Sequence, residues 1–185
     1  VSYTMTFSLK NTNKMLHFTF LGTSSGVPTL TRNVSGLAIR NSKNKDWILV
    51  DAGEGTQHRI QQAKLSLQSL VAICITHVHG DHCYGLIGLL ASAGMNARTA
   101  PLTIIAPKQI QQWIEITAQL TDLHLPYPLK FIDVNEATQI QQITDELSIE
   151  AHPLSHHIHM MWEHICNGGR LRSKRCASNS MENMD

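Results

Sequence analysis

The chain has 185 residues, of which 42% are hydrophobic and 16% charged, and its formal net charge is +1 at pH 7. This length and composition are typical of one globular domain and exclude disorder over the whole chain. The nearly neutral charge neither supports nor opposes nucleic-acid binding, because phosphates can be bound by a local basic patch or by metal ions.

The N-terminal residues, the apolar runs and the cysteines indicate in which cellular compartment the protein works. Residues 1–14 are polar rather than signal-like, and no apolar run approaches the roughly 18 residues of a membrane span. The cysteines at positions 74, 83, 166 and 176 form no CxxC pair, so a disulfide framework is not expected. We therefore expect a cytoplasmic protein without a membrane segment.

The predicted elements are those of a layered α/β domain that begins near Met15, and we interpret residues 1–14 as a disordered leader. We expect the natural start at either Val1 or Met15. Short β-rich runs then alternate with helical patterns. The predicted strands are Phe18–Leu21, Ser35–Arg40, Trp47–Asp51, Val71–Thr76, Leu102–Ala106, Leu129–Val134 and Leu147–Ala151. The predicted helices are Thr56–Ala63, Gly85–Ala93 and Gln109–Leu120.

The strand Val71–Thr76 is apolar with little alternation, so we expect it inside a sheet that is covered on both faces. It leads directly into His77 at the carboxyl end of the strand. Functional side chains commonly stand on loops at such strand ends, held by a rigid scaffold.

The run His77-Val78-His79-Gly80-Asp81-His82 predicts a metal site. It places His77, His79, Asp81 and His82 within six residues, and this spacing can divide the ligands between two adjacent ions. Nitrogen and carboxylate ligands suit Zn²⁺, with Mn²⁺ or Fe²⁺ as lesser alternatives. A pair of such ions would generate a bridging hydroxide and neutralise charge on a phosphate, which is hydrolytic chemistry.

A catalytic zinc ion usually has three protein ligands and one open position, so another ligand should follow elsewhere in the chain. We choose His156, because a predicted strand ends just before it. The histidines His152, His157 and His159 are the competing candidates.

Two further loops are candidates for the same site. The turn Gly22–Pro28 contains Ser24 and Ser25 and could approach a phosphate or a metal closely, although a plain tight turn is the alternative. Asp51 follows a strand and could orient a ligand histidine, or it could simply cap the next turn.

The stretches Phe20–Thr29 and Asp51–Gln57, together with His77–His82 and the following Tyr84–Leu90, resemble the ribonuclease Z family of the metallo-β-lactamase superfamily. The resemblance implies an αββα sandwich that cleaves precursor tRNA at its 3′ end, leaves a 3′-hydroxyl and uses two zinc ions.

By the same resemblance, His77, His79 and His156 hold one zinc ion, while Asp81 and His82 contribute to the other. Asp81 is also the implied proton acceptor. The family usually forms a homodimer and reads tRNA by shape and backbone contacts, which agrees with the lack of an aromatic single-strand-binding pattern in this sequence.

The resemblance extends to about residue 158, and Met160 to Glu163 depart from it. We therefore expect an incomplete metallo-β-lactamase domain over residues 15–160 and a polar, basic tail over 161–185. The second metal site would lack ligands unless His157, His159, His164 or Cys166 replaced them. Two alternatives stay open: another phosphodiesterase of this fold, and a truncated zinc-binding remnant without activity.

Overall fold

A computed structural model describes residues 2–10, 15–42, 45–145 and 147–154. None of the helices among these residues is long and apolar enough to span a membrane. The tail predicted for residues 161–185 and the candidate ligand His156 lie outside the described residues.

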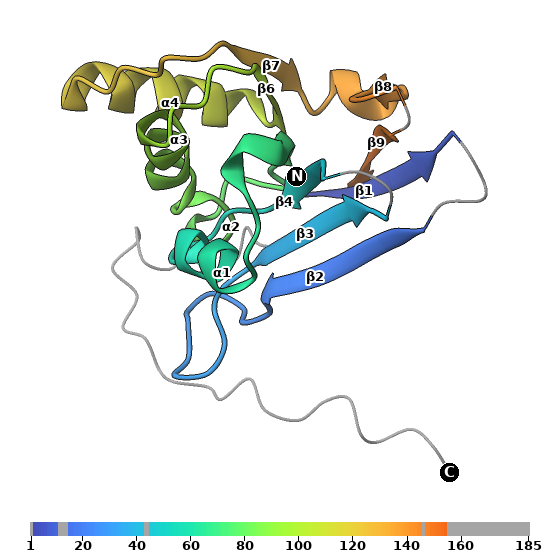
Figure 1. The fold of residues 1–185 in the computed structure, drawn as a ribbon, viewed down its shortest axis with the longest axis horizontal. Coiled ribbons are helices and arrows are strands. Elements are labelled where there is room, and N and C mark those ends of the chain that lie inside the picture. The colour runs from blue at the N-terminus through green and yellow to red at the C-terminus, as the bar shows by residue number, and fades with distance from the viewer. Residues whose placement is uncertain (1, 11–14, 43–44, 146, 155–185) are drawn as a thin grey trace, which may run out of the picture. The chain divides into compact units, whose positions relative to one another are not determined.

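A six-stranded mixed sheet forms the centre of the described unit (Figure 1). In spatial order its strands are β2 (Leu16–Gly22), β3 (Gly36–Asn41), β4 (Trp47–Val50), β5 (Leu70–Cys74), β6 (Leu102–Ala106) and β7 (Leu129–Asp133). The pairs β2–β3 and β3–β4 are antiparallel, whereas β4 to β7 run parallel. The parallel strands therefore bring their carboxyl ends to one edge, as expected for His77.

Helices cover one face of this sheet. They are α1 (Thr56–Gln62), the single turn α2 (Gly80–Cys83), α3 (Leu86–Met95) and α4 (Lys108–Thr121), and short 3-10 turns lie at Leu67–Ser69 and Glu136–Thr138. The apolar sides of α1, α3 and α4 pack on Leu49, Ile73 and Ile104 of the sheet in one buried cluster. The three predicted helices are thus confirmed, and α2 is an element that the sequence analysis missed.

A second, three-stranded sheet covers the opposite face in the order β1 (Ser2–Leu9), β9 (Leu147–Leu154) and β8 (Gln141–Gln142). Side chains from the other side of the central strands, such as Ile48 and Ile105, pack against Leu147 and Ile149. Burial on both faces of β5 confirms its prediction as an inner strand, since Ile73 belongs to the first cluster and Ala72 to the second.

The expectation of a disordered leader over residues 1–14 is wrong for its first part. Ser2–Leu9 forms β1 and pairs antiparallel with β9 along its whole length. Tyr3 is only 7% exposed, and its hydroxyl donates a hydrogen bond of 2.5 Å to Asn135 Oδ1. The segment is polar because alternate side chains face solvent, and only a partner strand far along the chain gives it regular structure.

The described residues thus form three layers, helices on sheet on sheet, of the predicted αββα sandwich. Each predicted strand is present, with ends that differ by a few residues. The strand expected to end at Asp51 ends at Val50, because Asp51 has a φ of 59° and leaves the extended conformation.

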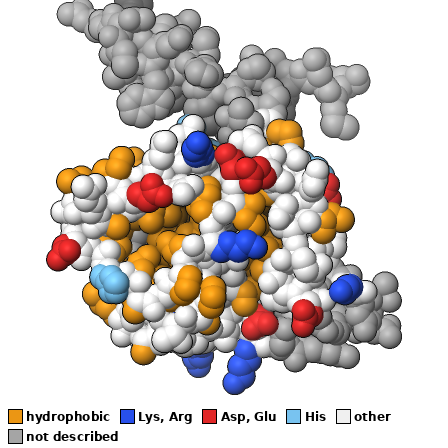
Figure 2. Space-filling model, turned by 90° about the horizontal axis from the view of Figure 1, so that it is seen from above, with side chains coloured by type: hydrophobic (Ala, Val, Ile, Leu, Met, Phe, Trp, Pro, Cys, Tyr) orange, Lys and Arg blue, Asp and Glu red, His pale blue; other side chains and the backbone are white. Residues whose placement is uncertain are grey.

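The outer strand β2 presents an apolar face to solvent. Phe18 is 54% exposed and Phe20 is 71% exposed, and both side chains point to the same face because they alternate along the strand. Other exposed apolar side chains lie on α4, at Ile116 and Leu120. Figure 2 looks at the side of the molecule on which α4 lies in Figure 1 and shows hydrophobic side chains gathered there, apart from β2. Clustered apolar surface favours association.

We expect the double substitution F18T/F20T to reduce self-association without a loss of stability. Both side chains are already largely exposed, so the free energy of unfolding should change by only about 0.5 kcal/mol. The matched control is Ile39→Thr, because Ile39 pairs directly with Phe18 but is fully buried; it should cost about 2 kcal/mol. Light scattering and urea denaturation measure the two effects. A stability loss in F18T/F20T equal to that of the control would show that the face is covered.

Candidate metal and phosphodiester site

The metal motif spans the exit from β5 and the short helix α2. His77 lies three residues beyond the end of β5 and is 8% exposed. His79 is the N-cap of α2, Asp81 lies in its first turn and His82 in its last. A single helical turn at Gly80–Cys83 thus carries Asp81 and His82 just beyond the end of the strand.

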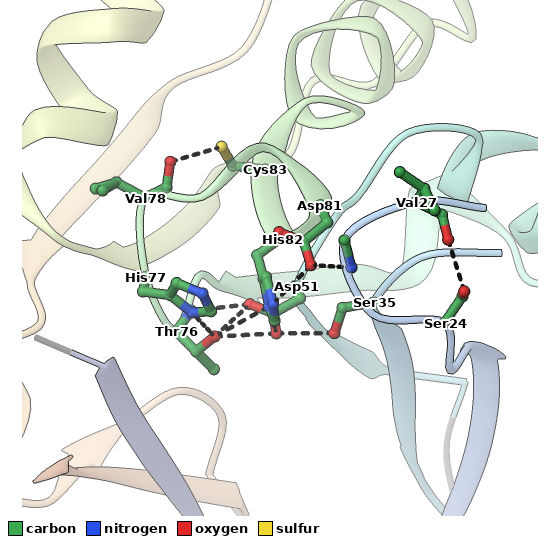
Figure 3. A network of polar contacts seen from close by, with 11 residues as sticks. Ser24, Val27, Ser35, Asp51, Thr76, His77, Val78, Asp81, His82 and Cys83 are labelled. Atoms are coloured by element: carbon green, nitrogen blue, oxygen red, sulfur yellow. Dashed lines mark hydrogen bonds and ion pairs between the residues drawn. The ribbon is translucent and has the colours of Figure 1, made fainter. Parts of the chain in front are cut away.

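The candidate ligands predicted from the motif lie close to one another, and Figure 3 shows three of them, His77, Asp81 and His82. The ring centroids of His77 and His79 are 4.7 Å apart, and those of His77 and His82 are 3.8 Å apart. Asp81 Oδ2 lies 3.4 Å from His82 Nε2. One short segment thus supplies three imidazoles and one carboxylate at the carboxyl edge of the sheet.

Asp51 connects these ligands to the scaffold. Its Oδ2 lies 2.7 Å from His82 Nδ1 and accepts a hydrogen bond of 3.1 Å from the Ser35 hydroxyl. Its Oδ1 accepts from the backbone N–H and the hydroxyl of Thr76, both at 2.9 Å. Because Asp51 Oδ2 is an acceptor, it favours the His82 tautomer that carries its proton on Nδ1 and leaves Nε2 free as a ligand. The contact supports the orienting role over the capping alternative.

Thr76 links Asp51 to the first histidine of the motif. Its hydroxyl lies 3.1 Å from His77 Nδ1 and 3.4 Å from His82 Nδ1. Neither Thr76 nor Ser35 was predicted as a partner of Asp51, because a single hydroxyl residue beside a strand end carries no distinctive pattern. The position of Thr76 immediately before His77 was the only available signal.

Two backbone hydrogen bonds hold the segment after Asp51 against the metal motif. The N–H of Ala52 donates to the carbonyl of His82 at 2.8 Å, and the N–H of Gly85 donates to the carbonyl of Ala52 at 2.8 Å. A Cβ atom on Gly53 would lie 2.2 Å from the carbonyl oxygen of Asp81. Glycine at position 53 is therefore required for this close packing.

The loop Gly22–Pro28 also reaches the motif. The N–H of Gly26 donates a hydrogen bond of 2.8 Å to Asp81 Oδ2, and Gly26 has a φ of 75°. The Ser24 hydroxyl donates to the carbonyl of Val27 at 2.6 Å, whereas Ser25 is exposed. Ser24 therefore stabilises the turn itself, while the loop as a whole lies beside Asp81.

Burial and neighbouring charges shift the pKa values of His77 and His82 in opposite directions. Burial, reinforced by the charge of His82, lowers the pKa of His77 to about 4, so this imidazole is neutral at pH 7. Burial also lowers the pKa of His82, but the hydrogen bond and charge of Asp51, with the charge of Asp81, outweigh it and raise that pKa. A neutral imidazole is the form that binds a metal ion.

The donor set matches a divalent cation in its chemistry but not in its arrangement among the described residues. Imidazole nitrogens and a carboxylate suit zinc and related ions. In the described ranges, however, no group of three or more His, Cys, Asp or Glu side chains is arranged to hold a metal ion. The competing ligand His152 lies on β9 with its Nε2 3.8 Å from Glu150 Oε1, and the other candidates beyond residue 154 lie outside the described part.

A cavity of about 260 Å³ adjoins Asp81. It is lined by Gly26, Val27, Pro28, Val34, Glu54, Gly80, Asp81 and Tyr84. The loop Gly22–Pro28 and the metal motif thus enclose a space next to the candidate ligands, where a substrate group could lie. Glu54 and Tyr84 are residues that the sequence analysis did not assign to the site.

Known proteins with similar sequences include several ribonucleases Z. The chain is 47% identical over 139 residues to ribonuclease Z from Pseudomonas putida (strain W619), a match that covers 75% of this chain and 43% of that protein. It is 49% identical over 143 residues to ribonuclease Z from Marinobacter nauticus, covering 77% of this chain and 44% of the relative. The family model described as "Anti-Pycsar protein Apyc1" matches residues 16–168. The chain belongs to this family and is a relative of ribonuclease Z.

Solved structures confirm the ribonuclease Z resemblance and the fold. Human tRNase Z, short form, superposes with a TM-score of 0.60 at 32% identity, covering 64% of this chain and 45% of the human one. The metallo-β-lactamase fold protein YhfI from Bacillus subtilis has a TM-score of 0.53 at 21% identity, with 68% and 49% of the two chains covered. The chain thus has the metallo-β-lactamase fold and spans less than half the length of the two ribonuclease Z relatives.

Proposed function

We propose that this chain carries part of the active site of a metal-dependent endoribonuclease of the ribonuclease Z type. Its substrate is precursor tRNA, cleaved at the 3′ end to leave a 3′-hydroxyl. The observation that carries the proposal is the hydrogen bond between Asp51 and His82 Nδ1. This hydrogen bond orients His82 so that its Nε2 is available to bind a metal ion. The proposal is further supported by the 47% identity over 139 residues to a ribonuclease Z.

Zinc is the proposed metal, with His77, His79 and His156 as ligands of one ion and Asp81 and His82 as ligands of another. When bound, the ions activate water for attack and neutralise charge on the phosphate. The described residues prepare the ligands: Asp51 fixes the His82 tautomer, Thr76 holds His77, and the Gly26 N–H holds the Asp81 carboxylate. Asp81 is the proposed proton acceptor.

A chimaera tests the proposal independently of the length of this chain. The 139 residues that match the Pseudomonas putida ribonuclease Z would replace the corresponding segment of that enzyme. We expect zinc-dependent cleavage of precursor tRNA with a 3′-hydroxyl product, lost in the H77A variant of the chimaera. We also propose that the protein forms a homodimer, as the family resemblance implies, and light scattering of the same chimaera measures its oligomeric state.

The outcomes separate the alternatives. A folded, zinc-loaded chimaera that hydrolyses bis(p-nitrophenyl) phosphate but leaves precursor tRNA intact would favour another phosphodiesterase of this fold. A folded chimaera that binds zinc and hydrolyses neither substrate would favour the inactive remnant. Zinc content, measured by mass spectrometry on the chimaera and its H77A variant, shows in each case whether the motif binds metal.

A further inference from the structure

Tyr84 presents an exposed aromatic ring at the rim of the 260 Å³ cavity. Its side chain is 69% exposed, although the residue directly follows Cys83, which is buried at the end of α2. The ring lies against Gly80, where an added Cβ atom would come within 2.1 Å of Tyr84 Cε2 and 2.4 Å of Cζ. The absence of a side chain at position 80 therefore lets the ring pack against the turn that carries Asp81.

A second aromatic residue supports the ring from a rigid helix. The centroids of Tyr84 and Trp113 are 6.4 Å apart, and their planes are inclined by 53°, which is within the usual range for interacting aromatic pairs. Trp113 is itself partly buried against the helical core cluster. Tyr84 is thus fixed by two neighbours while most of its surface faces solvent.

The charges of the cavity favour a neutral occupant over a phosphate. Its charged lining residues are Glu54 and Asp81, and no Lys or Arg is among the described residues that line it. Glu54 repels a phosphate at this cavity, and Asp81 does so as well whenever it holds no metal ion. A nucleobase, in contrast, offers a π face to the ring and exocyclic amines that can donate to a carboxylate.

We propose that Tyr84 stacks on the base of an unpaired nucleotide next to the scissile phosphodiester, and so selects substrates that carry a base at that position. This inference rests on the proposed function for the identity of the phosphodiester. An unstacked RNA base is typically recognised on an aromatic face, and such a contact contributes about 1–3 kcal/mol per base. Tyr84 would be a specificity-determining residue rather than a catalytic one.

The test is a double-mutant cycle on RNA binding, with the 185-residue chain kept metal-free so that no cleavage occurs. Fluorescence anisotropy measures the affinity for a precursor tRNA with a 3′ trailer, and for two versions that are abasic on either side of the cleavage position. We expect Y84A to weaken binding of the intact RNA by about 5- to 150-fold, and Y84F to bind as the wild type does. The RNA that lacks the base contacted by Tyr84 should bind the wild type and Y84A equally weakly, because neither protein can make the stacking contact with it.

Tyr84→Leu is the matched control, because it keeps an apolar side chain but removes the π face; it should bind nearly as weakly as Y84A. Circular dichroism verifies that each variant is folded. The inference is overturned if Y84A weakens intact and abasic RNAs by the same factor, or if the wild type does not distinguish them. Base-dependent binding in a protein whose chimaera cleaves no tRNA would instead refute the proposed function alone.

Discussion

Replacing Asp51 with asparagine is expected to weaken zinc binding by about 10- to 100-fold, the usual effect of removing a carboxylate that orients a ligand histidine. Asp51 uses both carboxylate oxygens as acceptors, one toward Thr76 and the other toward His82 and Ser35. An asparagine amide has one acceptor oxygen, so either the Thr76 N–H or His82 Nδ1–H loses its partner. Competition with a chromophoric chelator measures the affinity.

The same substitution should lower the free energy of unfolding by about 2–4 kcal/mol, because buried donors lose an ionised acceptor. The loss depends on pH, since Asp51 raises the pKa of His82. A raised pKa stabilises the fold below the ordinary histidine value, and this part disappears as the pH rises through the raised pKa. In the metal-free protein, the penalty of D51N should therefore be larger at about pH 5.5 than at about pH 8.5.

Ser35→Ala is the control for Asp51, because it removes one hydrogen bond to the same Oδ2 and leaves His82 in place. It should cost about 1 kcal/mol and change zinc affinity little. Asparagine also tolerates the positive φ of position 51 as aspartate does, so D51N isolates the carboxylate. Wild-type zinc affinity in D51N would contradict the orienting role.

Replacing Arg98 with methionine is expected to destabilise the fold by about 3–5 kcal/mol, the cost of breaking a buried charged network. Arg98 is 1% exposed. Its guanidinium donates to the carbonyls of Leu67, Ala100 and Pro101 at 2.7 to 2.8 Å, and lies 5.5 Å from the centre of the Tyr127 ring. Methionine keeps the apolar stem but leaves three carbonyls without donors.

Urea denaturation measures the free energy of unfolding of R98M. The control is Lys108→Met, which also replaces a basic side chain with methionine but at an exposed position. The control should stay within about 0.5 kcal/mol of the wild type. Arg98→Lys should be intermediate, because an ammonium cannot match the fork of three donors. Burial lowers the pKa of Arg98, but three carbonyl acceptors favour its charged form. Equal stability of R98M and wild type would show that other donors reach these carbonyls.

Local sequence patterns were enough to predict the central sheet and the chemistry of the site. Apolar β-rich runs such as Val71–Thr76 predict buried parallel strands, because each face of the strand must be covered. Because His77, His79, Asp81 and His82 fall within six residues directly after that predicted strand, all four lie near its carboxyl end. These are local patterns, and the structure keeps them.

The groups that complete these patterns come from distant parts of the chain and could be identified only in the folded protein. Asp51 could have capped a turn, and its contact with His82 exists because β4 and β5 are parallel neighbours that end together. The polar run Ser2–Leu9 becomes a strand only because β9 offers it an edge. Tyr84 meets Trp113 because α4 folds back beside the metal motif. Such pairings depend on chain topology, which no short window of sequence encodes.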